Sequence, residues 1–302
     1  MARPTLQQLQ YLVALDDHRH FGRAANAVSV SQPALSTQIR ELEKRVGAPL
    51  VERTSKRVLF TPTGSDIANR ARQILTSVDE LDRRGQGDLV GPLRFGVIPT
   101  MAPYLLLHVV ATMTNYPRAR ITLSEHRTPD LLVLLRSGSL DLAMLAGPVV
   151  GNDLYGEILA EDPFVLASST RRAASKRRSL LRLDELAGES VLLLDDGHCL
   201  RDQALSICAL ADVPAVDVAA TSLATLTQMV AADIGVTLLP SSTLAIEARP
   251  GSGIRIQQFH PPAPSRHITL AWRATSPRAA HYQAIAKLLR PLLREACKTT
   301  GS

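Results

Sequence analysis

Cysteine and aromatic residues are scarce in this chain, whose 302 residues include three cysteines, one tryptophan and 4% aromatic side chains in all. A small secreted domain stapled by disulfides is therefore excluded. Long apolar runs are missing too: the early segment YLVAL stops at Asp16 and Asp17, and no run approaches the roughly 18 residues of a membrane span. We therefore expect a cytoplasmic protein that does not associate with membranes.

The sequence also lacks the motifs of common enzyme classes. It has no GxGxxG after a predicted strand, no Walker loop, no HExxH and no GxSxG. His18 and His20 flank the end of a predicted helix, where capping or solvated histidines are more common than metal ligands. We expect no enzyme activity, no cofactor and no metal ion.

Positive charge is unevenly distributed along the chain. The formal net charge is +6, and residues 1–60 hold nine Lys/Arg against five Asp/Glu, a net of +4. At roughly 150 residues per domain, the length predicts two or more domains. The pattern favours a small nucleic-acid-binding module attached to a nearly neutral body.

Helical spacing near the N-terminus predicts a helix-turn-helix. Helices are expected at 5–17 and about 21–28, and a third begins after the N-cap Ser31 and ends at Gly47. The apolar residues of this third helix face inward, and its start displays small polar and basic side chains, as in a helix that reads the major groove. The candidate DNA contacts on this helix are Gln32, Pro33, Ser36, Thr37 and Arg40.

Residues 50–61, LVERTSKRVLFT, predict a basic hairpin wing. Arg53, Lys56 and Arg57 are the candidate phosphate contacts of this wing. A generic three-helix domain with a solvated basic edge is the alternative.

A helix starting at Thr61 and Pro62 carries apolar residues spaced four, three, four and three apart, which predicts a coiled-coil seam. These residues are Ile67, Ala71, Ile74, Val78 and Leu81. A seam on this helix favours a dimer, while a helix packed on its own domain is the alternative. Glycines at 85, 87 and 91 then mark a hinge.

The segment AANAVSVSQPALSTQIRELEKRVGAPLVERT, residues 24–54, resembles the N-terminal signature of the LysR-type transcriptional regulators. From residue 93 onward, predicted strands and helices alternate, as in α/β proteins with open sheets. The resemblance implies an α/β chain with three parts: a winged helix-turn-helix (1–60), a linker helix with a hinge (61–90), and a periplasmic-binding-protein-like regulatory domain (91–302). It divides the last part into subdomain I, about 91–162 and 269–302, and subdomain II, about 163–268.

The stretch GHCLRDQALSIC holds two of the three cysteines. Cys199 is expected at a helix start beside His198 and Arg201, a setting that favours the thiolate, although Asp195, Asp196 and Asp202 oppose it. Cys208 lies in an apolar segment. On one helix the two Cα atoms would be about 13 Å apart, too far for a disulfide unless the helix unwinds. The pair is therefore either a redox switch or two incidental cysteines.

GHCLRDQA with a second cysteine nine positions on, together with segments such as GPLRFGVIPTMAPYLLLH, is similar to the peroxide-sensing members of this family. The resemblance implies that Cys199 reacts with hydrogen peroxide and Cys208 resolves it, with His198, Thr100, Thr128 and Arg266 around the sulfur. It also implies double-stranded operator DNA, oxidative-stress defence genes, a homodimer or homotetramer, RNA polymerase and cellular thiol reductants. The segment PAPSRHITL departs from the family in having fewer basic residues, and Cys297 matches no family role.

Two other functions remain open from the residues. One is a LysR-type regulator that binds a small metabolite between its subdomains. The other is a thiol peroxidase, against which the DNA-binding head argues.

Overall fold

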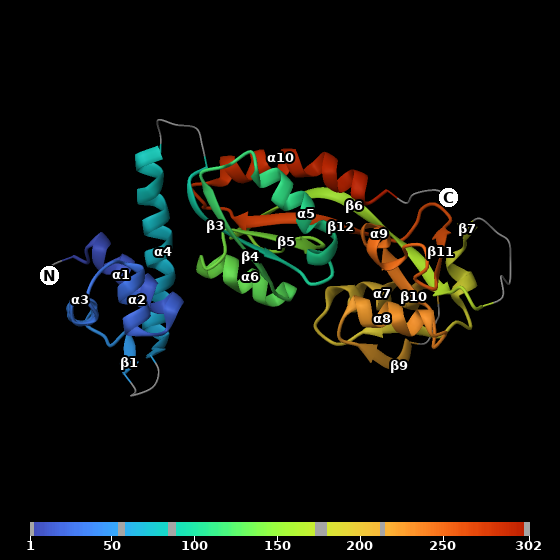
Figure 1. Cartoon of the computed structure of the whole chain (residues 1–302), viewed down its shortest axis with the longest axis horizontal. Coiled ribbons are helices and arrows are strands. Elements are labelled where there is room, and N and C mark those ends of the chain that lie inside the picture. The colour runs from blue at the N-terminus through green and yellow to red at the C-terminus, as the bar shows by residue number, and fades with distance from the viewer. Residues whose placement is uncertain (1–2, 54–57, 84–88, 173–179, 212–214, 299–302) are drawn as a thin grey trace. The chain divides into compact units, whose positions relative to one another are not determined.

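A computed structural model describes residues 3–53, 58–83, 89–172, 180–211 and 215–298, and the side chains of 53, 79–83 and 215–219 lie outside the description. The chain divides into two compact units, residues 1–88 with 136–139, and residues 89–135 with 140–302. Lys56 and Arg57 fall outside the described residues. Figure 1 shows the elements of both units.

Unit 1 contains the predicted helix-turn-helix. Its elements are α1 (Leu6–His18), α2 (Phe21–Ala27), α3 (Gln32–Val46), the hairpin β1 (Val51–Arg53) and β2 (Val58–Phe60), and α4 (Pro62–Arg83). The side chain of Ser31 accepts from Ala34 N, and Gly47 ends α3 with φ +78, so both predicted caps are confirmed. Buried side chains of α1, α2, α3, α4 and the hairpin form one core, which includes Leu12, Leu15, Ala24, Leu35, Ile39, Leu42, Val58 and Ala68.

Helix α4 is packed on its own domain along its first half. Arg72 is buried and its Nη2 lies 2.6 Å from Asp16 Oδ2 of α1. Ile67 packs against the core of unit 1 and Ala71 is buried, whereas Ile74 is 45% exposed. The start of the predicted seam is therefore covered by unit 1, whereas Ile74 is exposed and Val78 is half-buried; the side chain of Leu81 lies outside the description.

The first part of unit 2 is a parallel sheet with helices on both faces. Strands β3 (Gly91–Val97), β4 (Ala119–Glu125) and β5 (Leu142–Ala146) are parallel, with β3 in the middle. Helices α5 (Ala102–Met113) and α10 (Ala279–Ala296) lie on one side and α6 (Thr128–Ser137) on the other (Figure 1). Buried Leu, Val and Met side chains between these layers make the first core.

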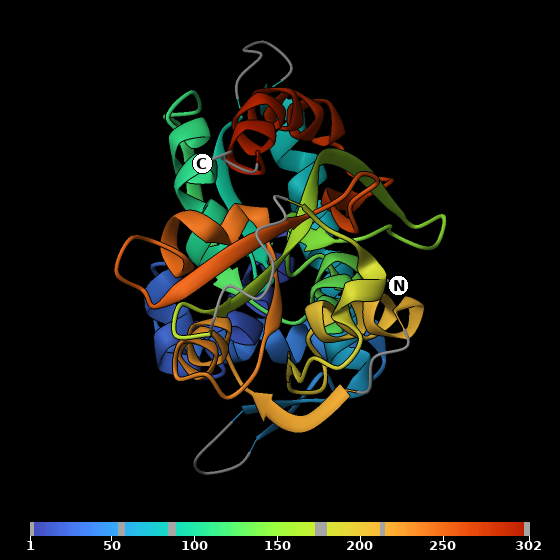
Figure 2. The same ribbon diagram turned by 90° about the vertical axis from the view of Figure 1, so that its right-hand side faces the viewer.

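The second part of unit 2 has its own core. It contains β7 (Leu180–Leu181), a 3-10 helix η1 (Leu183–Leu186), β8 (Val191–Leu194), α7 (Cys199–Leu210), β9 (Ala215–Ala220), α8 (Leu223–Ala231), β10 (Thr237–Pro240), a second 3-10 helix η2 (Ser241–Thr243), α9 (Leu244–Glu247) and β11 (Ile254–Phe259). Strands β8 and β9 are parallel and form a two-stranded sheet. Figure 2 shows β9 at the edge of this part.

Two long strands join the parts. Strand β6 (Leu154–Ser169) and β12 (Ser265–Arg273) pair antiparallel from Pro163 with Ser265 to Leu154 with Arg273. The main sheet has the order β4-β3-β5-β12-β6-β11-β7, with β10 also on β6. The resemblance implied two subdomains joined by two crossovers, and β6 and β12 are the two strands that run through both parts. The approximate subdomain boundaries, about 162/163 and 268/269, fall inside these strands.

The sequence predicted only FVLAS of β6 and none of β11. Both strands mix exposed and buried residues without strict alternation, since each changes its packing partners along its length. None of the described helices is both long enough and apolar enough to span a bilayer.

Candidate functional site

The turn between β8 and α7 presents Cys199. Strand β8 ends at Leu194, Gly197 has φ +87, and Cys199 is the first residue of α7. The left-handed backbone at 197 favours glycine and reverses the chain so that the helix can begin. Cys199 is half-buried and packs against the core of the first part of unit 2, although its own helix belongs to the second part.

Burial raises the pKa of the Cys199 thiol above its ordinary value, and two groups from other elements act in the opposite direction. The Arg266 guanidinium favours the thiolate through its charge, and so does the buried Thr128 hydroxyl at the start of α6, which makes no hydrogen bond within the described residues. Burial is the largest effect, and the pKa lies above its ordinary value. The site therefore holds mostly thiol at neutral pH, with a cation and a hydroxyl available to the thiolate.

The predicted sources of thiolate stabilisation differ from those in the structure. Burial lowers the pKa of His198, which favours the neutral ring, although its Nε2 is 3.1 Å from Asp195 Oδ1. Arg201 pairs with Asp196 at 3.0 Å and donates to the Leu194 carbonyl. The cation whose charge acts on the sulfur is Arg266, which β12 contributes from 67 positions further along the chain. Asp202 raises the thiol pKa, as expected.

Arg266 is fully buried and its guanidinium is held on several sides. Its Nε lies 2.9 Å from Asp162 Oδ2 on β6, and two other nitrogens donate to the hydroxyl and carbonyl of Thr100 at 3.3 Å. Asp162 also accepts from the backbone N and the hydroxyl of Ser242 at 2.9 and 2.7 Å. This network fixes one positive charge in a dry region.

Cys208 lies on the same helix as Cys199, as predicted. It is 1% exposed, belongs to the core of the second part, and burial raises its pKa. Nine residues of α helix separate the two Cα atoms by about 13 Å. All three cysteines are free thiols in the structure.

The structure thus brings Cys199, Thr128, Thr100 and Arg266 together, while the His198 side chain is turned to Asp195. Sequence reasoning missed Asp162, Ser242 and Arg127. Asp162 was detectable as one of two adjacent acids, with Glu161, ahead of an apolar run, but its partner lies 104 residues away. Arg127 precedes Thr128, and its Nη1 donates to the Asp196 carbonyl at 2.8 Å.

Cys297 ends α10 beside the same network. It is buried, and burial together with the nearby Asp162 raises its pKa well above the ordinary value, while Arg266 acts in the opposite direction. The raised pKa keeps the Cys297 thiol protonated, and burial shields it from oxidants in solution.

A half-open pocket of about 390 Å³ is lined by residues of the second part and of the connection from β11 to β12. Its walls are mostly apolar, and its lining residues are Arg182, Leu183, Phe259, His260, Pro262 and Pro264. Among the residues of known placement, no cluster of His, Cys, Asp and Glu has a metal-binding arrangement.

The candidate DNA contacts of α3 lie at its start. Gln32, Pro33, Thr37 and Arg40 are exposed and Ser36 is half-buried, while Leu35 and Ile39 face the core. His20 caps α2, with Nδ1 accepting from Gly22 N and Arg23 N, as its predicted capping role requires. Arg53 ends β1, and its side chain is outside the description.

Two family models match the chain and together cover most of it. "Bacterial regulatory helix-turn-helix protein, lysR family" matches residues 6–65, and "LysR substrate binding domain" matches residues 86–294.

Curated relatives are similar over nearly the whole length. A "DNA-binding transcriptional dual regulator OxyR" of Escherichia coli K12 is 42% identical, with 94% of each chain covered. A "Probable hydrogen peroxide-inducible genes activator" of Streptomyces viridosporus is 40% identical, with 97% of this chain and 96% of the relative covered.

Solved structures agree with these matches. A full-length OxyR variant from Pseudomonas aeruginosa has a TM-score of 0.82 at 32% identity, covering 95% of this chain and 98% of that one. The oxidized form of Corynebacterium glutamicum OxyR has a TM-score of 0.59 at 32% identity, covering 98% and 94%. The chain therefore belongs to the lysR family of regulatory helix-turn-helix proteins, and within it to the group that includes OxyR.

Proposed function

We propose that this chain is a DNA-binding transcriptional regulator that senses hydrogen peroxide through Cys199. The observation that carries the proposal is the setting of the Cys199 sulfur, which lies half-buried with the Thr128 hydroxyl and the fixed charge of Arg266 acting on it. A cation and a hydroxyl beside a thiol are the groups that stabilise a thiolate and hold a peroxide oxygen. The relatives named for hydrogen peroxide-inducible genes support the same function.

The chemistry proceeds in two steps. The Cys199 thiolate attacks one peroxide oxygen, the O–O bond breaks, hydroxide leaves, and a sulfenic acid forms. The Cys208 thiol then attacks the sulfenic sulfur, water leaves, and the disulfide forms. A dithiol reductant of the cell reduces the disulfide to two thiols by thiol–disulfide exchange. The reductant itself is oxidised to a disulfide.

The second step requires a conformational change. A disulfide needs Cα atoms less than about 7 Å apart, and the α7 geometry holds them at about 13 Å. Helix α7 therefore has to unwind between the two cysteines. Since Cys199 packs on one core and Cys208 lies in another, this movement would alter both parts of unit 2.

The assignments for DNA binding and assembly follow from the winged helix-turn-helix and from helix α4. Operator DNA would contact the start of α3 and the wing, and the open half of the α4 seam would pair two chains. We propose a homodimer or homotetramer in the cytoplasm that engages RNA polymerase at oxidative-stress defence genes. We also propose that peroxide is consumed once per oxidation cycle, without the steady turnover of a peroxidase.

The test is a DNA footprint of the reduced and peroxide-treated chain, with thiol mapping by mass spectrometry on the same samples. The variant Cys199→Ser should bind DNA but show one footprint under both conditions. The variant Cys208→Ser should form the sulfenic acid and no 199–208 disulfide. A peroxide-dependent footprint retained in Cys199→Ser would overturn the proposal, and so would steady peroxide consumption with a thiol reductant.

A further inference from the structure

Arg127 connects the first part of unit 2 to the turn that precedes Cys199. It stands directly before Thr128, the residue that starts α6 and interacts with the Cys199 sulfur. Its Nη1 donates to the Asp196 carbonyl at 2.8 Å, and its Nη2 lies 3.4 Å from Asp195 Oδ2. Of two adjacent residues in one segment, Thr128 therefore favours the Cys199 thiolate and Arg127 is bonded to the turn.

Gly197 allows the guanidinium to come this close. A Cβ at position 197 would lie 2.5 Å from Arg127 Nη1 and 3.2 Å from its Cζ, so any larger residue displaces the arginine. The backbone at 197 has φ +87, which independently favours glycine. Glycine at position 197 is therefore needed both for the backbone of the turn and for the close approach of Arg127.

We propose that Arg127 is a positioning residue that holds the 195–197 turn in the reduced form and so controls how readily oxidised Cys199 reaches Cys208. This inference rests on the proposed function. Arg127 contacts the backbone of the turn and not the reacting atoms, so it is not a catalytic residue. Its short bond to a carbonyl matters more than the longer pair with Asp195, since exposed ion pairs contribute little.

The physical reason is the path of the second oxidation step. Cys199 sulfenic acid and the Cys208 thiol condense to a disulfide with loss of water only after the start of α7 leaves its place. The turn moves with Cys199, and the bond from Arg127 to Asp196 must break first. Loss of that bond should leave the first step unchanged and speed the second about tenfold, the factor that about 1.4 kcal/mol represents.

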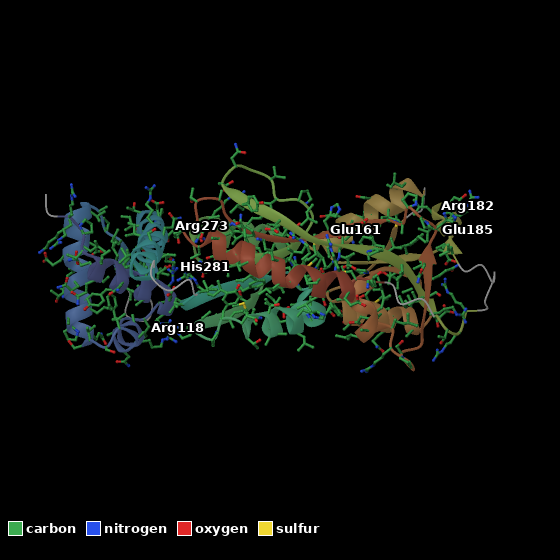
Figure 3. All side chains as sticks on the ribbon, turned by 90° about the horizontal axis from the view of Figure 1, so that it is seen from above. Arg118, Glu161, Arg182, Glu185, Arg273 and His281 are labelled. Atoms are coloured by element: carbon green, nitrogen blue, oxygen red, sulfur yellow. The ribbon has the colours of Figure 1, made fainter. Side chains whose placement is uncertain are left out.

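The experiment uses the full-length reduced chain mixed rapidly with hydrogen peroxide. Dimedone traps the sulfenic acid, alkylation traps free thiols, and mass spectrometry follows both over time. Arg127→Gln removes both the positive charge and the planar guanidinium with its several N–H donors. Arg127→Lys keeps the positive charge but not the guanidinium. Arg182→Gln is the matched control, because Arg182 is an exposed, ion-paired arginine that lies with Glu185 at the outer end of the second part (Figure 3).

In Arg127→Gln we expect sulfenic acid formation within twofold of the original chain and disulfide formation about tenfold faster. Arg127→Lys should lie between the two, and Arg182→Gln should match the original. Hydrogen exchange of the amides at 197–200 should be faster in reduced Arg127→Gln, while the rest of α7 is unchanged.

Equal disulfide rates in Arg127→Gln and the original chain would overturn this inference. A slower first step in Arg127→Gln would also overturn it, because the arginine would then act on the reacting sulfur. If the original chain forms no sulfenic acid at Cys199, the proposed function fails instead, so the two failures are distinguishable.

Discussion

Arg266 Nε and Asp162 Oδ2 lie 2.9 Å apart, with both side chains fully buried on the paired strands β12 and β6. A buried ion pair of this kind is costly to break, since removal of one partner leaves a charge without compensation. The pair holds the cation that acts on Cys199, and it joins the two strands that connect the parts of unit 2.

The first prediction concerns this pair. Asp162→Asn should reduce the free energy of unfolding by about 3 kcal/mol, because Arg266 loses its counter-charge in a dry site. The matched control is the adjacent Glu161→Gln, since Glu161 is exposed and accepts a hydrogen bond from the Ser265 hydroxyl. Urea denaturation measures both. Equal stability of the two variants would show that the buried pair does not stabilise the fold.

The second prediction is a pH dependence. Burial raises the pKa of the Cys199 thiol, so less thiolate is present at pH 7 and its alkylation rate should keep rising through the alkaline range. Thr128→Val removes a hydroxyl that favours the thiolate, so the pKa should rise further and the rate at pH 7 should fall several-fold. Iodoacetamide labelling of Cys199 against pH gives both values.

Thr112→Val is the control for this measurement, because Thr112 is a buried threonine on α5 that does not act on the Cys199 pKa. A rate profile of Thr128→Val that coincides with the original chain would remove Thr128 from the sulfur's environment.

The third prediction concerns the wing. Arg53→Gln should weaken DNA binding at all sequences and reduce the slope of log K against log salt by about 0.9, as expected for one lost phosphate contact. Arg70→Gln is the control, since Arg70 is exposed on α4 and paired with Asp66. Fluorescence anisotropy at several salt concentrations decides, and an unchanged slope would exclude Arg53 as a phosphate contact.

The fourth prediction concerns the open part of the linker helix. Ile74→Glu should shift the chain toward monomer in analytical ultracentrifugation, because a charge replaces an exposed apolar side chain on the proposed seam. The neighbouring exposed Gln73→Glu adds the same charge on another face and should leave the mass distribution unchanged. Identical behaviour of the two variants contradicts the seam.

The local elements were readable from the sequence. Ser31 and Gly47 bound α3 because capping depends on neighbouring residues, and the spacing of Leu35, Ile39 and Leu42 placed its buried face. The placement of Cys199 and Cys208 on one helix followed in the same way. Each of these features depends on interactions between residues that are close together in the sequence.

The surroundings of the sulfur depended on the tertiary structure. Local sequence suggested that His198 and Arg201 activate Cys199, but both turn to aspartates of the same turn. The resemblance implied that Arg266 and Thr128 surround the sulfur, because a guanidinium can stabilise a thiolate and a hydroxyl can hold a peroxide oxygen, but Asp162 and Arg127 were missed. Sequence alone determined the helices, their caps and the spacing of the two cysteines. Only the pairing of β6 with β12 decided which charge reaches Cys199, because burial and long-range contacts set that pKa.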